Sequence, residues 1–236
     1  MLSLNFYYRL RYLIKKKSNI QVILSFLTDR LKHPFLKSKK KHERLMHQNY
    51  LKNKKISTDY FSTNAYYWKN IIKKYFKKFT YLEIGSWEGN SALFVLKNLN
   101  PTKVICVDVW EDEKLSQMQK RNYNNFKINL DEFQEKMSMY KGSSDDYFSK
   151  CEEKFDVIYI DGAHETEQVY KDINNSWKVL NKNGLIICDD FFYGNLYGVP
   201  ENVPSIAINK FIIENKKKIK IICVNNAQIF FKKISD

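Results

Sequence analysis

The sequence has no long apolar run, and this absence excludes a large class of proteins. A helix that spans a bilayer needs about 20 predominantly apolar residues, and no stretch of the 236 residues reaches that length. The N-terminus also lacks a short basic region followed by an uninterrupted apolar stretch and a small-residue cleavage site. We therefore predict a protein that has no transmembrane segment and is not exported.

Cysteine is scarce, and its placement does not resemble a disulfide framework. Three of the four cysteines, Cys106, Cys188 and Cys223, lie inside apolar runs that read as strands. No C-x-x-C pair is present, so a zinc or thiol-redox site is not indicated. Buried, free cysteines are typical of a reducing compartment, and we predict a cytoplasmic location.

Acidic residues are almost missing from the first third of the chain. Residues 1–80 hold 20 Lys and Arg against three acids, a net charge of +17, whereas residues 81–236 carry −3. Aromatic residues interrupt the basic segment, among them Phe6, Tyr12 and Phe35. This pattern predicts contact with nucleic acid or another anionic surface through residues 1–60. The alternative is a solvated lysine-rich face, in a sequence that prefers Lys throughout.

A helical extension is predicted for residues 1–60. Ile20, Leu24, Leu27 and Leu31, together with Ile23, recur at intervals of three and four residues and predict one apolar helix face. Pro34 and the lysine cluster of residues 37–41 are expected to break this helix. A second helical pattern over residues 66–79 leads into the remainder of the chain.

From Thr80 onward, short β-branched runs alternate with helical patterns, as in a doubly wound α/β sheet. The last two runs are separated by only three residues, so they form a hairpin and the final strand is antiparallel to its neighbour. We predict a Rossmann-like, mostly parallel seven-stranded sheet in a domain of residues 61–236. The predicted strands are 80–84, 104–108, 137–140, 155–160, 184–189, 219–224 and 228–234.

The most informative stretch joins the first strand to a helix through a glycine turn, Glu83-Ile-Gly85-Ser86-Trp-Glu-Gly89-Asn-Ser91. Such a turn brings backbone N–H groups and a helix N-terminus against an anionic ligand group. The dinucleotide pattern G-x-G-x-x-G is not met, because Trp87 and Asn90 occupy its second and third glycine positions. A second strand ends in Asp108, 23 residues after Gly85. A carboxylate at this position can accept hydrogen bonds from the hydroxyls of a ribose.

The motif Glu-x-Gly-x-x-x-Gly resembles motif I of the class I S-adenosylmethionine-dependent methyltransferases. The resemblance implies that Gly85, Ser86 and Gly89 line the methionine part of the cofactor. It further implies that Glu83 places the cofactor's amino group and that Ser91 binds its carboxylate. Asp108 then becomes the ribose ligand, and Ser144 and Asp145, after the third strand, match the place where this family holds the adenine ring.

Three carboxylates follow the next two strands and predict a metal site. Asp161 ends the strand 155–160, and Asp189 and Asp190 end the strand 184–189. Adjacent parallel strands present their carboxyl ends to the same crevice, so these acids converge. Mg²⁺, which prefers oxygen ligands, would neutralise them and lower the pKa of a bound substrate hydroxyl.

These residues resemble the small bacterial metal-dependent O-methyltransferases of the sugar and catechol types. The resemblance implies catalytic roles for Asp161, which also lies beside the cofactor, and for His164 as general base. His33, His42 and His47 have no ligand partners at metal-site spacing and are expected to be solvated. We predict an O-methyltransferase that acts on a hydroxyl of a sugar or other small molecule, with Mg²⁺ as second cofactor and a homo-oligomer left open. The alternatives are an RNA methyltransferase that binds its substrate through residues 1–60, and a noncatalytic Rossmann-like binding protein.

Overall fold

The computed structural model describes residues 4–110, 117–193, 202–225 and 227–235. The chain divides into two compact units, one of residues 34–151 and the other of residues 1–33 and 152–236. Helix α2 (Ile20–Leu51) contributes to both. The first unit further holds η1 (Ser62–Asn64), α3 (Ala65–Tyr75), β1 (Phe79–Ile84), α4 (Asn90–Asn98), β2 (Pro101–Asp108), α5 (Gln117–Leu130), η2 (Asp131–Phe133), β3 (Met137–Lys141) and α6 (Ser144–Lys150).

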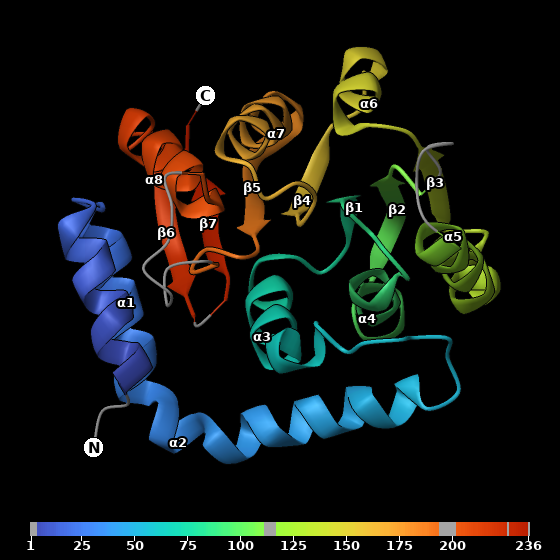
Figure 1. The fold of residues 1–236 in the computed structure, drawn as a ribbon, viewed down its shortest axis with the longest axis horizontal. Helices are drawn as coiled ribbons and strands as arrows, with labels where there is room; N and C mark the ends of the chain where they lie inside the picture. Colours follow the sequence, from blue (N-terminus) through green and yellow to red (C-terminus); the bar gives the residue numbers. More distant parts are fainter. Residues whose placement is uncertain (1–3, 111–116, 194–201, 226, 236) are drawn as a thin grey trace. The chain divides into compact units, whose positions relative to one another are not determined.

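The second unit begins with a helix and ends with the C-terminal hairpin. In it, α7 and α8 lie side by side, as Figure 1 shows in orange and red. Its elements besides α2 are α1 (Leu4–Lys15), β4 (Phe155–Ile160), α7 (Thr166–Val179), β5 (Leu180–Cys188), α8 (Pro204–Glu214), β6 (Ile219–Val224) and β7 (Ile229–Lys233).

The strands form a seven-stranded sheet of order β3-β2-β1-β4-β5-β7-β6. Strands β1, β2 and β3 pair in parallel, and so do β4 and β5. Strand β7 is antiparallel to both β5 and β6. The predicted fold class is therefore confirmed, including the antiparallel hairpin and the helical N-terminus.

Helix α2, the long blue helix of Figure 1, corrects one prediction about the N-terminal region. It does not end at Pro34 but continues to Leu51, although proline removes one helical hydrogen bond and crowds the preceding turn. Its predicted apolar face is also largely exposed, since Ile20 and Leu31 are 64% and 75% accessible. The buried positions are instead Val22 and Phe26, at 0% and 2%.

Phe26 shows why the other face of α2 is buried. Its ring stacks on Phe6 of α1 at a centroid distance of 5.5 Å and meets Phe192, in the loop after β5, at 5.3 Å. Tyr12 of α1 shares a 2.6 Å hydrogen bond with Ser205 of α8. Helix α1 and the first half of α2 are thus packed onto the C-terminal half of their unit.

In the part of the chain that the structure describes, no helix combines the length and the apolar character needed to cross a bilayer.

Candidate functional site

The turn after β1 has a strained backbone that only a few residue types adopt. Gly85 and Gly89 have φ angles of +85° and +81°, and Trp87 between them has +47°. A Cβ on Gly89 would lie 3.0 Å from Leu130 and 3.1 Å from Phe126. Glycine is therefore required at Gly89 for both its backbone conformation and its close packing.

Asp108, at the end of β2, closes this turn. Its Oδ2 atom accepts hydrogen bonds from the backbone N–H groups of Ser86 and Trp87, at 2.9 and 2.7 Å. We predicted that N–H groups of the turn would face an anionic group of a ligand. In this structure two of them face a carboxylate of the chain itself, so the turn and the predicted ribose ligand are held together as one assembly.

The segment after β3, which was predicted to hold the adenine ring, is joined to Asp108 by a backbone hydrogen bond. The N–H of Gly142 donates to the carbonyl oxygen of Asp108 at 3.0 Å. Helix α6 begins two residues later, and Ser143 caps it by accepting from Asp146 N at 3.1 Å. The structure therefore anchors the start of the segment that carries Ser144 and Asp145 beside the end of β2.

Glu83 is fully buried on β1 and is held by two hydroxyl groups. Tyr81 donates to one carboxylate oxygen at 2.5 Å, and Ser91 donates to the other at 2.9 Å. Burial raises the pKa of Glu83 to about 7, although these hydrogen bonds oppose the shift. Two residues predicted to bind the methionine end of a cofactor thus contact each other directly.

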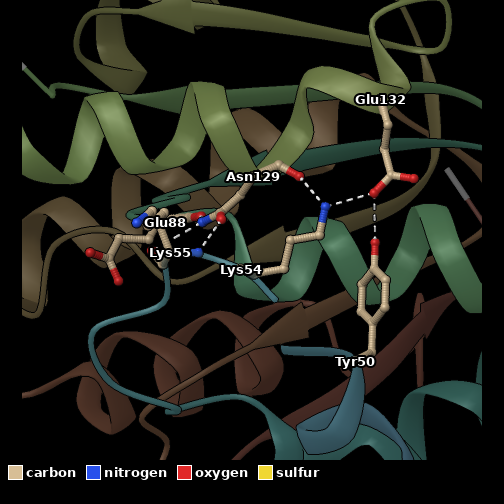
Figure 2. Close-up of polar contacts among 6 residues, drawn as sticks. All are labelled: Tyr50, Lys54, Lys55, Glu88, Asn129 and Glu132. Atoms are coloured by element: carbon tan, nitrogen blue, oxygen red, sulfur yellow. Dashed lines mark hydrogen bonds and ion pairs between the residues drawn. The ribbon is translucent and has the colours of Figure 1, made fainter. Parts of the chain in front are cut away.

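A segment just before the predicted domain boundary holds the glycine turn from its other side. The buried carboxylate of Glu88 accepts from the backbone N and the hydroxyl of Ser57, at 2.6 and 2.9 Å, and from Asn125 at 2.7 Å. Figure 2 shows Asn129 of α5 between Glu88 and Lys55: its side chain accepts from Lys55 N at 2.6 Å and donates to Glu88 O at 2.9 Å.

A more exposed contact lies at the edge of this network. Glu132 accepts from Lys54 at 2.6 Å and from Tyr50 at 3.0 Å, as Figure 2 shows. Lys54 also donates to the carbonyl oxygen of Asn129 at 3.0 Å. Residues 50–57 are therefore fastened to α5, η2 and the glycine turn.

His47 contradicts the expectation that the N-terminal histidines are solvated. Only 3% of its surface is accessible, and its ring packs edge-on against Phe61 and Phe94. Its Nε2 atom shares a 2.8 Å hydrogen bond with Asn90 at the start of α4. Burial lowers the pKa of His47. Sequence spacing did not identify this position because its partners are distant in the chain.

In the second unit, Asp161, His164 and Asp190 form a group with metal-site geometry. One ligand atom from each lies within 4.8 Å of the other two, and His164 Nε2 lies 2.8 Å from Asp190 Oδ2. Two carboxylates and one imidazole match the ligand preferences of a divalent cation. Of the predicted metal ligands, Asp161 and Asp190 are thus brought together, with His164 beside them.

Asp189, the remaining predicted ligand, is partly buried and is held by other groups of the chain. Its Oδ2 accepts from Gln228 at 2.8 Å and from Tyr159, and its Oδ1 accepts from Asp190 N at 2.8 Å. Burial and the charge of Asp190 raise the pKa of Asp189. Tyr159 also contacts Asp161 at 2.8 Å. Because a phenol has one proton, it donates to only one carboxylate at a time.

His164 sits at the exposed edge of the group. Its hydrogen bond to Asp190 raises its pKa, and partial burial opposes the shift. The ring stacks obliquely on Tyr193 at a centroid distance of 4.7 Å. A raised pKa means that the imidazole is a stronger base here than in water.

Several residues of the two groups were not predicted, although some carry a sequence signal. Tyr81 and Tyr159 each stand two residues before a carboxylate in a strand or directly after one, and side chains at i and i+2 share one face of a strand. Asn125 and Asn129 are four apart on a helix and share a face in the same way. Ser57 and Gln228 lie in loops and carry no comparable signal.

A comparison with protein families gives a match to part of the chain. Residues 82–191 match the family model described as a methyltransferase domain. This match runs from within β1 to the loop after β5 and includes Glu83, Asp108, Asp161, His164 and Asp190. Just under half of the chain thus resembles a methyltransferase domain, which supports the predicted class of enzyme.

Three individual proteins illustrate what the chain is similar to. It is 29% identical over 140 residues to the uncharacterized protein R132 of Acanthamoeba polyphaga mimivirus, a match that covers 57% of this chain and 60% of that protein. An O-methyltransferase from Bacillus cereus, solved with SAH, has a TM-score of 0.56 at 14% identity over 90% of this chain and 99% of its own. The SAH-bound methyltransferase PaMTH1 of Podospora anserina has a TM-score of 0.55 at 16% identity, with 82% and 88% covered.

Proposed function

We propose that this protein is an S-adenosylmethionine-dependent O-methyltransferase, assisted by a divalent metal ion, that acts on a hydroxyl of a sugar or other small molecule. The observation that carries the proposal is the group Asp161, His164 and Asp190, whose ligand atoms lie within 4.8 Å of one another. Two carboxylates at such close range repel each other, and a divalent cation bound between them would relieve this repulsion.

The cofactor would be held by the residues around the glycine turn. We assign the methionine end to Gly85, Ser86, Gly89 and Ser91, with the carboxylate of Glu83 facing the amino group. Asp108 would bind the ribose, and Ser144 and Asp145 the adenine. The support for this assignment is that Asp108 is bonded to the turn and Glu83 to Ser91.

Asp161 and Asp190 are the proposed metal ligands, and Asp189 would orient them through the hydroxyl of Tyr159 and the backbone N–H of Asp190. A bound divalent cation would lower the pKa of a substrate hydroxyl. His164 would take the proton of that hydroxyl on Nδ1, because Nε2 carries the hydrogen that it donates to Asp190. This role makes His164 a base rather than a metal ligand.

The cofactor half of the proposal is tested by calorimetric titration of S-adenosylhomocysteine into the protein. We expect micromolar binding, which disappears in an Asp108→Ala variant and persists in a Glu135→Gln variant, because Glu135 is an exposed carboxylate away from the turn. An absence of binding to the unmodified protein would remove the central claim.

The metal half is tested by the methylation rate with polyhydroxylated and phenolic acceptors before and after EDTA treatment. We expect loss of turnover, recovery with Mg²⁺ or Mn²⁺, and unchanged affinity for S-adenosylhomocysteine. Asp190→Asn should cut turnover by about 100-fold, whereas Glu167→Gln, an exposed carboxylate at the start of α7, should not. Full turnover in EDTA would refute the metal role.

A further inference from the structure

One face of the first half of α2 is apolar and exposed to solvent. Ile20, Leu24 and Leu31 have accessible fractions of 64%, 54% and 75%, and the partly exposed Ile23 and Leu27 complete the same face. The opposite side of this half-helix carries Val22 and Phe26, which pack against the unit. The stripe formed by these five residues is thus apolar surface that packing in its own unit does not use.

Helix α1 of the same unit also exposes apolar side chains. Tyr7 and Ile14 are 58% and 60% accessible. Together with Leu10, Arg11 and Lys15 they line a shallow groove along one side of the helix. Apolar and basic side chains are therefore mixed on this surface as well.

The charge around the stripe is almost entirely positive. Arg30 and Lys32 are the immediate neighbours of Leu31 and so lie on its two sides, about 100° around the helix. Between residues 4 and 33 the chain has seven Lys and Arg and a single acid, Asp29. The exposed cations of this segment are Arg11, Lys15, Lys16, Lys17 and Lys32.

Charge and chemistry together distinguish the possible occupants of the stripe. A second copy of the chain would bring two clusters of positive charge together, which is unfavourable. RNA would neutralise the cations but has no aliphatic surface against which Ile20, Leu24 and Leu31 could be buried. An anionic lipid surface satisfies both, since acyl chains accept the aliphatic side chains while headgroups attract Lys and Arg.

We infer that α1 and the first half of α2 bind the surface of an anionic membrane, with the stripe of Ile20, Ile23, Leu24, Leu27 and Leu31 inserted among the lipids. The inference does not depend on the proposed O-methyltransferase activity. It describes a helix that lies in the interface, which is compatible with the lack of a membrane-spanning helix among the described residues.

The test is sedimentation of the full chain with vesicles of phosphatidylcholine alone or mixed with phosphatidylserine. We expect binding to the mixed vesicles, weakened by salt, and little binding to phosphatidylcholine. Leu24→Gln/Leu31→Gln should reduce binding roughly tenfold or more, with unchanged thermal stability because both side chains are exposed and Gln suits a helix. Gln21→Ala, on an exposed position beside the stripe, should bind as the unmodified chain does.

Three results would overturn the inference. The first is equal recovery of the unmodified chain and the double variant from the mixed vesicles. The second is a stable dimer by light scattering that the double variant converts to a monomer without any vesicle binding. The third is tight, salt-sensitive binding of a single-stranded RNA with no sedimentation on vesicles, which would assign the basic segment to nucleic acid.

Discussion

Glu83 illustrates how a buried carboxyl group in the cofactor half of the site affects stability. Burial raises its folded-state pKa from the ordinary 4.5 to about 7. The fold therefore favours the neutral form, and this stabilisation is fully present below pH 4.5 and is lost as the pH rises through about 7. A shift of this size corresponds to about 3 kcal/mol of stability.

The first prediction concerns Glu83→Gln, which keeps the shape of the side chain and removes its titration. Above pH 7 we expect the variant, without cofactor, to be more stable than the unmodified protein by about 3 kcal/mol, with the difference vanishing near pH 4. We also expect it to lose affinity for S-adenosylhomocysteine, whose amino group has lost its carboxylate partner. Urea unfolding at several pH values measures the first effect; a pH-independent difference would contradict it.

The second prediction concerns the pair of His164 and Asp190. Because the hydrogen bond to Asp190 is the largest cause of the raised pKa of His164, Asp190→Asn should lower that pKa. NMR titration of the histidine ring in the metal-free protein measures it directly. Glu167→Gln is the matched control, as it removes an exposed charge from the start of α7 without touching the pair. An unchanged His164 titration in Asp190→Asn would show that the pair does not persist in solution.

At the scale of single residues, the sequence predicted the acids and missed their partners. Asp108, Asp161 and Asp190 were identifiable because they end apolar strands. The hydroxyl of Tyr159 and the amide of Gln228 donate hydrogen bonds to Asp189, and these residues come close to Asp189 only in the folded chain. Which of these carboxylates lie together depends on backbone detail such as the positive φ of Asp190, +52°.

At the scale of elements, strands were more predictable than helix faces. Each predicted strand starts or ends close to the observed one, because short β-branched runs bounded by polar residues are typical of strands. Helix α2 was predicted less well. Its regular apolar spacing at Ile20, Leu24 and Leu31 indicated one apolar face, but the side chains that tertiary packing buries are Val22 and Phe26.

The third prediction compares two residues that fasten residues 50–57 to the glycine turn and its neighbours. Asn129 is inaccessible to solvent, so Asn129→Ala leaves Lys55 N and Glu88 O without their partner. We expect a loss of about 3 kcal/mol in stability and weaker binding of S-adenosylhomocysteine. Glu132→Ala breaks the exposed contacts of the same segment and should cost less than about 1 kcal/mol. Chemical unfolding and calorimetry distinguish the two, and equal effects would argue against the assignment.

At the scale of the whole molecule, the charge is distributed unevenly along the chain. The net charge of +14 arises before residue 81, and both compact units draw part of it from α2. The proposed division into an extension of residues 1–60 and a catalytic domain of residues 61–236 rests on this change in composition. Composition indicates which segments are polar enough to be solvated. It carries no information on which residues of those segments form hydrogen bonds with the rest of the chain.

The fourth prediction tests that division by shortening the chain. A fragment that starts at residue 61 loses Ser57 and Lys55, the partners of Glu88 and Asn129, and His47, the partner of Asn90. A chain that starts at residue 18 keeps all of these contacts. We therefore expect the longer fragment to bind S-adenosylhomocysteine nearly as the full chain does, and the shorter one to bind it at least tenfold more weakly. If calorimetry gave the shorter fragment full affinity and a cooperative melt, residues 1–60 would be an independent appendage, and the contacts of residues 47–57 would be dispensable for the cofactor turn.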